Sequence, residues 1–280
     1  MSGRLYLCGT PIGNLEDITL RALATLKEVD LIAAEDTRHT LKLLNHYQIK
    51  KKLISYHEHN RKQRGREIIE LLKAGKNIAL VSDAGMPGIS DPGTDLVRLA
   101  LENDLEVVPI PGPTAFVTGL VVSGFPTDSF IFMGFVPKSK KERQELWAFL
   151  KEEKRTTVFY ESPHRLLATL EEAEEELGGE RPVVVARELT KTFEEVRRGS
   201  LSEVREWFAQ KPVKGEITII FSGVEKEREE MDESVLLEEG KKEVMQLISS
   251  GMSHNEAVKN VAKKLNLSKR ELYNFVLKSN

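Results

Sequence analysis

The sequence predicts an α/β fold in three parts: an α/β domain with a parallel sheet at residues 1–111, a second α/β domain with a mixed sheet at residues 112–224, and a small helical domain at residues 225–280. Three observations predict this fold class. The chain has 280 residues, enough for two domains of roughly 100–200 residues and a small third. Short apolar runs alternate with segments of helical periodicity through the first two parts. At Glu225 the composition changes abruptly, because an acidic run begins there.

In the first part, strands and helices alternate, which implies right-handed crossovers and a parallel sheet. The runs expected to form strands are Leu5–Cys8, Leu31–Ala34, Leu53–Tyr56, Ile78–Val81 and Glu106–Ile110. The segments expected to form helices are Leu20–Val29, Thr40–Tyr47, Glu67–Leu72 and Leu96–Leu101. The strand segments are apolar without alternation, so we expect both faces of this sheet to be buried.

The second part opens with Thr114–Ser123, which is apolar nearly all round and predicts a buried helix. Strands are expected at Phe130–Phe135, Thr157–Tyr160, Val183–Ala186, Phe193–Arg198 and Glu216–Phe221. Further helices are expected at Glu145–Leu150, His164–Leu177 and Leu201–Phe208. Together these elements indicate a second, mixed α/β unit.

The third part begins with the run EKEREEMDESVLLEE at residues 225–239, which predicts a linker entering a helix. Two capping boxes follow, Ser253 with Glu256 and Ser268 with Glu271, and each opens an amphipathic run. They predict helices at Asn255–Leu265 and Lys269–Lys278. From residue 244 onward Lys and Arg outnumber Asp and Glu six to two, so we expect a short basic helix–turn–helix.

Composition excludes several classes of protein. The net charge is −3, so nucleic-acid binding would need a local basic patch rather than a uniformly basic chain. A single cysteine, Cys8, excludes an internal disulfide or a cysteine-based zinc site and fits a reducing compartment. The longest apolar run, residues 115–125, is about half of the ~20 residues that a transmembrane helix needs. With no apolar region for a signal peptide, the expected location is the cytoplasm.

Three loops rich in glycine and proline follow strands of the first sheet. They are GTPIGN at Gly9–Asn14, SDAGMPGISDPG at Ser82–Gly93 and PGPTA at Pro111–Ala115. Open α/β sheets bind ligands at the carboxyl ends of their strands, and glycine lets the backbone approach a ligand. An ordinary connection is the alternative for each loop by itself, whereas their shared edge favours a pocket. None has the G-x-G-x-x-G spacing of a dinucleotide site.

These motifs, together with AEDTR (Ala34–Arg38), FYESPHR (Phe159–Arg165) and ARELTK (Ala186–Lys191), carry a family resemblance. In order along residues 4–223, the set resembles the ribosomal RNA small subunit methyltransferase I family of the tetrapyrrole-methylase fold group. The resemblance implies two α/β domains with S-adenosylmethionine in the cleft between them. It also implies methyl transfer to the ribose 2′-oxygen of a cytidine in the decoding centre of 16S rRNA, no metal, and a homodimer.

Carried over to this chain, the resemblance implies a set of cofactor-binding residues in the loops and in the second domain. They are Asp83, Gly85, Met86, Pro87, Gly88, Ile89, Pro113, Thr114, Ala115, Tyr160, Glu161, Arg187 and Thr218. Tetrapyrrole-methylating relatives generally have G-D-P where this chain has Gly85-Met86-Pro87, which argues against a tetrapyrrole substrate. A small-molecule methylase of this fold and a non-catalytic ribosome-binding factor remain the alternatives.

The proton of the ribose hydroxyl needs an acceptor, because a protonated hydroxyl is a poor nucleophile. We predict Glu188 and Lys191 in ARELTK as the catalytic residues, with Glu161 and Asp36 as further candidates. Each has a structural alternative. Glu188 and its neighbour Arg187 could pair with each other or with Glu161 and Arg165, and Asp36 could cap a helix after Thr37.

RNA contacts are predicted from clusters of Lys and Arg, for which a solvated face is the alternative. Lys50–Lys52 form one such cluster. The residues proposed to bind RNA are Arg61, Lys62, Arg64, Arg66, Lys138, Lys140, Lys141, Arg143, Lys263, Lys264, Lys269 and Arg270. The pair His57 and His59 has a spacing that could hold a metal, but exposed polar side chains are the expected role.

Overall fold

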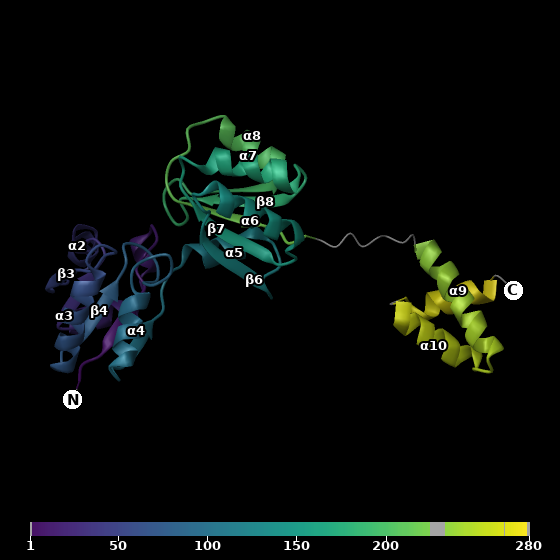
Figure 1. Ribbon diagram of the computed structural model, residues 1–280, viewed down its shortest axis with the longest axis horizontal. Coiled ribbons are helices and arrows are strands. Elements are labelled where there is room, and N and C mark those ends of the chain that lie inside the picture. Colours follow the sequence, from purple (N-terminus) through teal and green to yellow (C-terminus); the bar gives the residue numbers. More distant parts are fainter. Residues whose placement is uncertain (1, 225–232, 266, 279–280) are drawn as a thin grey trace. The chain divides into compact units, whose positions relative to one another are not determined.

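The computed structural model describes residues 2–224, 233–265 and 267–278. The chain divides into two compact units, Met1–Val224 and Glu225–Asn280. The first unit contains two separate sheets with helices packed on their faces (Figure 1).

The first sheet is formed within residues 5–110, and all of its strands are parallel. Its strands are β1 (Leu5–Cys8), β2 (Leu31–Ala34), β3 (Leu53–Ser55), β4 (Ile78–Val81) and β5 (Val107–Ile110). Their order is β3-β2-β4-β1-β5. Because β4, β1 and β5 are neighbours, the three glycine-rich loops that follow them leave the sheet side by side.

Helices cover both faces of this sheet, as the unbroken apolar strands predict. On one face, α1 (Leu20–Glu28) and α2 (Thr37–His46) pack against Ile32 and Ala34. On the other face, α3 (Arg61–Lys73) and α4 (Thr94–Glu102) pack against Leu31 and Ala33. Alternate residues of β2 therefore enter two different cores. A short 3-10 helix, η1 (Leu15–Asp17), precedes α1.

The second sheet is mixed, with the order β6-β7-β10-β8-β9. Its strands are β6 (Phe130–Phe135), β7 (Thr156–Glu161), β8 (Pro182–Arg187), β9 (Glu195–Ser200) and β10 (Ile217–Phe221). Strand β6 runs parallel to β7, and the remaining pairs are antiparallel. The apolar helix α5 (Ala115–Ser123) covers one face, and α6 (Lys140–Glu152), α7 (Leu166–Leu177) and α8 (Leu201–Ala209) cover the other.

Two helices begin more than a full turn earlier than the apolar periodicity predicts. Helix α3 begins at Arg61 rather than near Glu67, and α6 begins at Lys140 rather than near Glu145. Lys, Arg and Gln favour helices even where no apolar side chain marks the period. At α6 the Ser139 hydroxyl also accepts a hydrogen bond from the Glu142 backbone amide at 3.2 Å. Two of the predicted basic clusters are therefore helical.

The second unit consists of α9 (Glu233–Ser249), α10 (His254–Leu265) and α11 (Lys269–Lys278). A small core joins them, including Val244 of α9, Val261 of α10 and Leu272 of α11. The predicted helix–turn–helix is thus present, and α9 packs against it. Residues 225–232 of the predicted acidic linker lie outside the described residues. In the part of the chain that is described, no helix is long and apolar enough to cross a membrane.

Candidate active site

The three glycine-rich loops of the first sheet contact one another. Thr10 and Gly85 form a two-way backbone bridge, with N–O distances of 2.9 and 3.0 Å. The Thr10 hydroxyl also donates to the Ser82 carbonyl at 3.1 Å. A Cβ on Gly9 would lie 2.7 Å from the Gly112 Cα, so these loops can meet only because both positions lack side chains.

A loop of the second sheet closes over this assembly. The Asn14 backbone amide donates to the Thr190 hydroxyl at 3.0 Å. A Cβ on Gly13 would lie 2.4 Å from the Lys191 side chain. The segment after β8 therefore packs directly on the loop after β1, and the two sheets enclose the space between them.

That space is a cavity of about 390 Å³, a size typical of small-molecule sites. The loops after β1, β2, β4 and β5 form one wall, and the second sheet forms the other. The lining residues are Ile12, Glu35, Asp83, Ala84, Gly85, Met86, Ile89, Ser90, Asp91, Thr114, Ala115, Phe135, Tyr160, Glu161, Ser162, Pro163, Ala186, Leu189, Gly215, Glu216, Ile217 and Thr218.

Most of the residues predicted to bind a cofactor lie on this lining. They are Asp83, Gly85, Met86, Ile89, Thr114, Ala115, Tyr160, Glu161 and Thr218. Pro87, Gly88 and Pro113 stand next to lining residues in the chain but are not part of the lining. Arg187 is also outside it, since its guanidinium bonds to Glu195 at 3.0 Å and to two backbone carbonyls.

Three carboxylates, Glu35, Asp83 and Asp91, lie on the pocket wall. Burial and the nearby charge of Glu35 raise the pKa of Asp91 to about 7, although a hydrogen bond from Ser82 opposes this shift. Burial also raises the pKa of Glu35. The carboxylate of Asp83 accepts a hydrogen bond from the Asp36 backbone amide at 3.0 Å, and this bond joins the loops after β2 and β4. The wall therefore gathers three carboxyl groups, two of which have raised pKa values.

The opposite wall carries Tyr160 and Glu161 from β7. The Tyr160 hydroxyl accepts a hydrogen bond from the Phe116 amide at 3.2 Å, and burial raises its pKa to about 12. The carboxylate of Glu161 accepts bonds from the Ser162 amide and the Thr169 hydroxyl, each at 2.7 Å. The Glu161 side chain is fully buried, and these two bonds hold its carboxylate in place within the fold.

The predicted catalytic residues, Glu188 and Lys191, bond to each other at 2.8 Å and do not line the cavity. Glu188 also accepts from the Glu216 backbone amide at 3.0 Å. Burial would raise the pKa of Glu188, but the bonds from Lys191 and Glu216 outweigh it, and the net pKa is lowered. A carboxylate with a lowered pKa is a weak base. The geometry therefore fits the alternative that Glu188 forms a structural ion pair, with Lys191 as its partner instead of Arg187.

Two further candidates have structural roles. Asp36 is the N-cap of α2 and accepts from the Arg38 amide at 2.8 Å. The pKa of the Asp36 carboxyl is lowered, mainly by a hydrogen bond from the Arg38 guanidinium and secondly by the bond from the Arg38 backbone amide. His57 lies 3.3 Å from the amide nitrogen of Asn60. Among the described residues, no group of three or more His, Cys, Asp or Glu side chains could hold a metal ion.

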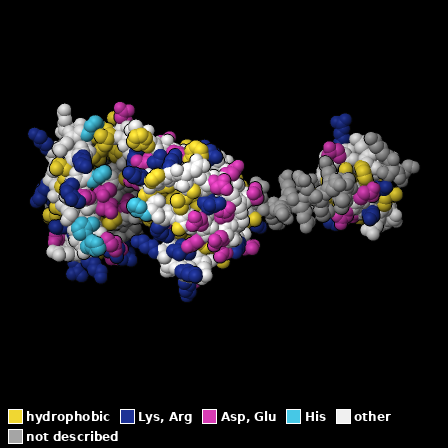
Figure 2. Space-filling model, turned by 90° about the horizontal axis from the view of Figure 1, so that it is seen from above, with side chains coloured by type: hydrophobic (Ala, Val, Ile, Leu, Met, Phe, Trp, Pro, Cys, Tyr) yellow, Lys and Arg dark blue, Asp and Glu magenta, His cyan; other side chains and the backbone are white. Residues whose placement is uncertain are grey.

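The basic side chains predicted to bind RNA differ in how far they are engaged. Arg61 pairs with Glu58 and Asp95, Arg64 pairs with Glu67, and Lys264 pairs with Glu243. Arg143 pairs with Glu172, and Lys141 lies 3.9 Å from Glu145. Lys141 and Lys264 are nevertheless exposed, as are Lys62, Arg66, Lys138, Lys140, Lys263, Lys269 and Arg270. On the face drawn in Figure 2, acidic and basic side chains are interspersed over the first unit.

Sequence reasoning missed some of the lining. Asp91 and Glu35 belong to quoted motifs, SDAGMPGISDPG and AEDTR, but neither was assigned a role. Their position after β4 and β2 was the available signal. Phe135 and Glu216 carried no sequence signal, because their place on the wall depends on how the second sheet is built.

Known proteins with similar sequences and folds indicate the family to which this chain belongs. Residues 4–205 match the family model described as Tetrapyrrole (Corrin/Porphyrin) Methylases. A relative from Halalkalibacterium halodurans, named Ribosomal RNA small subunit methyltransferase I, is 50% identical over 97% of this chain and 94% of its own length. A relative of the same name from Thermotoga maritima is 54% identical over 80% of this chain and 100% of its own length.

Among solved structures, uroporphyrin-III-C-methyltransferase from Thermus thermophilus is similar in fold. It superposes with a TM-score of 0.57 at 20% identity, over 78% of this chain and 94% of its own. At that identity the likeness concerns the fold alone. The family match and the sequence relatives go further: this chain belongs to the tetrapyrrole (corrin/porphyrin) methylase family and, within it, to the ribosomal RNA small subunit methyltransferase I family of methyltransferases.

Proposed function

We propose that this protein transfers a methyl group from S-adenosylmethionine to the ribose 2′-oxygen of a cytidine in the decoding centre of 16S rRNA. The observation that carries the RNA substrate is the 50% identity, over nearly the whole chain, to a relative named for small-subunit ribosomal RNA methylation. The cytidine, its 2′-oxygen and the decoding centre follow from the family resemblance of the motifs.

The pocket residues fit S-adenosylmethionine. The volume of about 390 Å³ suits a ligand of this size. Ile12, Ala84 and Ala115 offer an apolar surface, and the Glu35 carboxylate offers negative charge to the sulfonium and ammonium groups. When bound, S-adenosylmethionine supplies a methyl group on a positively charged sulfur that departs as a neutral thioether.

What the chain itself must supply is an acceptor for the proton of the ribose hydroxyl. We infer that this acceptor is Asp91 rather than Glu188, because Asp91 lines the pocket and has a pKa of about 7. The Asp91 carboxylate would accept the proton of the ribose hydroxyl as the ribose oxygen takes the methyl group. Holding the hydroxyl in line with the methyl group supplies the rest of the acceleration.

The second unit is proposed to add RNA affinity without forming the methyl-transfer site. It presents exposed Lys263, Lys269 and Arg270 on α10 and α11. The Thermotoga maritima relative is matched over its whole length by 223 residues of this chain, about the length of the first unit. A family member can therefore have about the length of the first unit alone. This supports a role in substrate capture, rather than in chemistry, for the second unit of this chain, Glu225–Asn280.

The test is incubation with labelled S-adenosylmethionine and either small ribosomal subunits or uroporphyrinogen. We expect label in the RNA of the subunits and none in the porphyrinogen. Label in the porphyrinogen would support the small-molecule alternative. Binding of S-adenosylmethionine without transfer to either substrate would support the non-catalytic ribosome-binding alternative. The cytoplasmic location and the homodimer stay predictions, the latter checked by mass measurement in solution.

A further inference from the structure

An exposed aromatic ring stands at the mouth of the pocket. Phe135 lines the cavity, yet 56% of its surface is open to solvent. It is the last residue of β6, and its ring lies edge-on to that of Tyr160 with centroids 5.6 Å apart. A phenyl ring left in water beside a binding site forgoes the free energy that burial would provide, which points to a contact made when substrate is present.

A β-bulge turns this ring toward the pocket. Phe132 pairs with Val158, but the next recorded pair is Phe135 with Tyr160, so β6 contains one residue more than β7. The extra residue falls at Met133–Gly134, and Gly134 has a φ of +68°. Side chains alternate between faces along a strand. Without the bulge, residue 134 would lie opposite Tyr160 and Phe135 would point to the other face.

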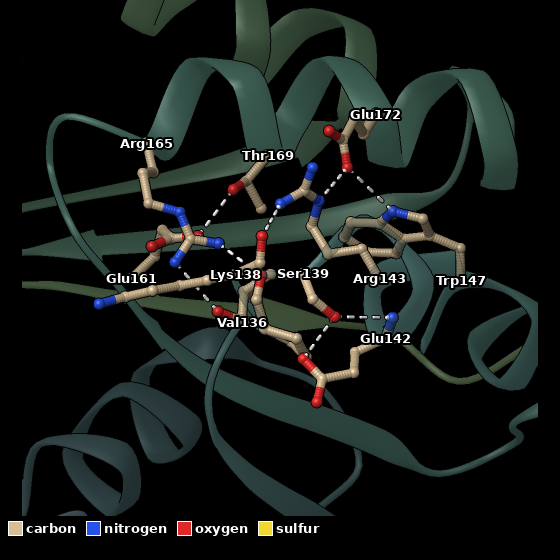
Figure 3. Close-up of polar contacts among 11 residues, drawn as sticks. Val136, Lys138, Ser139, Glu142, Arg143, Trp147, Glu161, Arg165, Thr169 and Glu172 are labelled. Carbon is tan, nitrogen blue, oxygen red and sulfur yellow. Dashed lines mark hydrogen bonds and ion pairs between the residues drawn. The ribbon is translucent and has the colours of Figure 1, made fainter. Parts of the chain in front are cut away.

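The chain that follows Phe135 is held in place by two arginines. Arg165 donates to the Val136 and Pro137 carbonyls at 3.1 and 2.7 Å. Arg143 donates to the Lys138 carbonyl at 2.7 Å. Figure 3 shows the two guanidinium groups on either side of this segment. A ring mounted on such a fixed segment loses little conformational freedom when a ligand contacts it.

Carboxylates anchor both arginines in turn. Arg165 lies 3.5 Å from the buried carboxylate of Glu161, and Arg143 bonds to Glu172 at 2.7 Å. These contacts explain why Arg143, predicted from its charge to bind RNA, is engaged inside the protein. Lys138 differs, since its side chain is exposed.

We propose that Phe135 is the stacking platform for the base of the nucleotide whose ribose is methylated, with Lys138 contacting an adjacent phosphate. The proposal rests on the proposed function and adds the way in which the acceptor is held. Enzymes that act on a base take that nucleotide out of its stack, and the proposal extends this to a nucleotide whose ribose enters the pocket. Stacking on an aromatic side chain replaces the lost contact, and exposed aromatic rings recognise unstacked RNA bases in this way.

The test uses full-length Phe135→Ala and Phe135→Trp, with Phe149→Ala as the matched control. Phe149 is an exposed phenylalanine on α6 that does not line the pocket. Apparent KM for small ribosomal subunits and kcat are measured with labelled S-adenosylmethionine at saturation, and cofactor affinity is measured separately by calorimetry. We expect Phe135→Ala to raise KM about 5- to 150-fold, the range for loss of one stacked base. Phe135→Trp and Phe149→Ala should stay near wild type, and cofactor affinity should be unchanged in all three.

Two outcomes overturn the proposal while leaving the proposed function intact. If Phe135→Ala weakens S-adenosylmethionine binding, the ring contacts the methyl donor instead. If it changes neither constant, the ring contacts no reactant. A wild-type protein that does not methylate small-subunit RNA contradicts the proposed function itself, and the stacking proposal is then overturned with it. Lys138→Ala supplies a second readout, an apparent affinity for the subunits that depends less steeply on salt.

Discussion

Asp91→Asn is the change that most directly probes how the pocket handles the proton. The amide has nearly the shape of the carboxylate, but it cannot accept a proton or carry charge. A general base typically contributes about 10²–10⁴-fold to a rate. We therefore expect this variant to lower the single-turnover methylation rate by at least 10²-fold, with little change in the dissociation constant of S-adenosylmethionine.

The same change, Asp91→Asn, should increase the stability of the folded protein although it lowers the rate. A pKa of about 7 for Asp91, against roughly 3.9 for an ordinary Asp, is a shift of about 3 units or ~4 kcal/mol. The pocket wall is open to water, so we take half of this figure, about 2 kcal/mol. Because the folded pKa is raised, the unfolded chain gives up this proton first. The penalty on folding therefore grows from about pH 4 to pH 7 and is fully present above pH 7.

Removing that penalty should raise Tm at pH 8 by about 4–8 °C for a unit of this size, with no comparable gain at pH 4. The assay pairs melting curves with single-turnover rates from pH 5.5 to 8.5. The wild-type rate should rise with pH and level off above pH 7, as the carboxylate becomes available. Asp128→Asn, at an exposed position, is the matched control and should change neither quantity. Wild-type turnover in Asp91→Asn, or a flat wild-type pH profile, would refute the role given to Asp91.

Three further outcomes follow from the geometry. Gly85→Val should abolish S-adenosylmethionine binding while circular dichroism keeps its overall native form, because a β-branched residue is strained at the φ of +80° that Gly85 adopts, and the pocket wall must shift to relieve this strain; retained binding by calorimetry would contradict this. Glu188→Gln and Lys191→Ala should lower Tm but leave the turnover of the folded protein within a few-fold of wild type, since this pair joins loops outside the cavity; a 10²-fold loss of turnover at native Tm would restore their catalytic role. Truncation after Val224 should weaken capture of the ribosomal substrate and leave cofactor affinity unchanged, and an unaltered KM would instead indicate that the second unit has only a packing role.

The first sheet and its loops were predictable because local signals specified them. Unbroken apolar runs such as Ile78–Val81 predict strands buried on both faces, and the loops that follow them must leave at the same edge. The position of the pocket follows from that topology. The starts of α3 at Arg61 and of α6 at Lys140 could not be located from apolar periodicity, because charged side chains leave no apolar period to detect, although they favour helices.

The assignment of Glu188 and Lys191 as catalytic residues stays a prediction, because it depends on where their side chains point. A carboxylate and an ammonium three residues apart at a strand end could face the cleft or each other, and the sequence does not decide between these arrangements. In the structure Glu188 has a φ of +53°, and its side chain bonds to Lys191 and the Glu216 amide. Likewise, a single extra residue in β6 decides which face of the sheet Phe135 lies on. Its position at the pocket therefore follows from the pairing of β6 with β7, which the sequence does not specify.

The most direct test of the proposed reaction is alkaline hydrolysis of 16S rRNA after the protein has labelled small ribosomal subunits with methyl-labelled S-adenosylmethionine. A 2′-O-methyl group removes the hydroxyl that would attack the neighbouring phosphate, so the chain resists cleavage at that position. The account predicts that the label appears in one alkali-resistant dinucleotide whose first nucleoside is cytidine. Label in a mononucleotide, in a ribosomal protein or in no part of the subunit would contradict it.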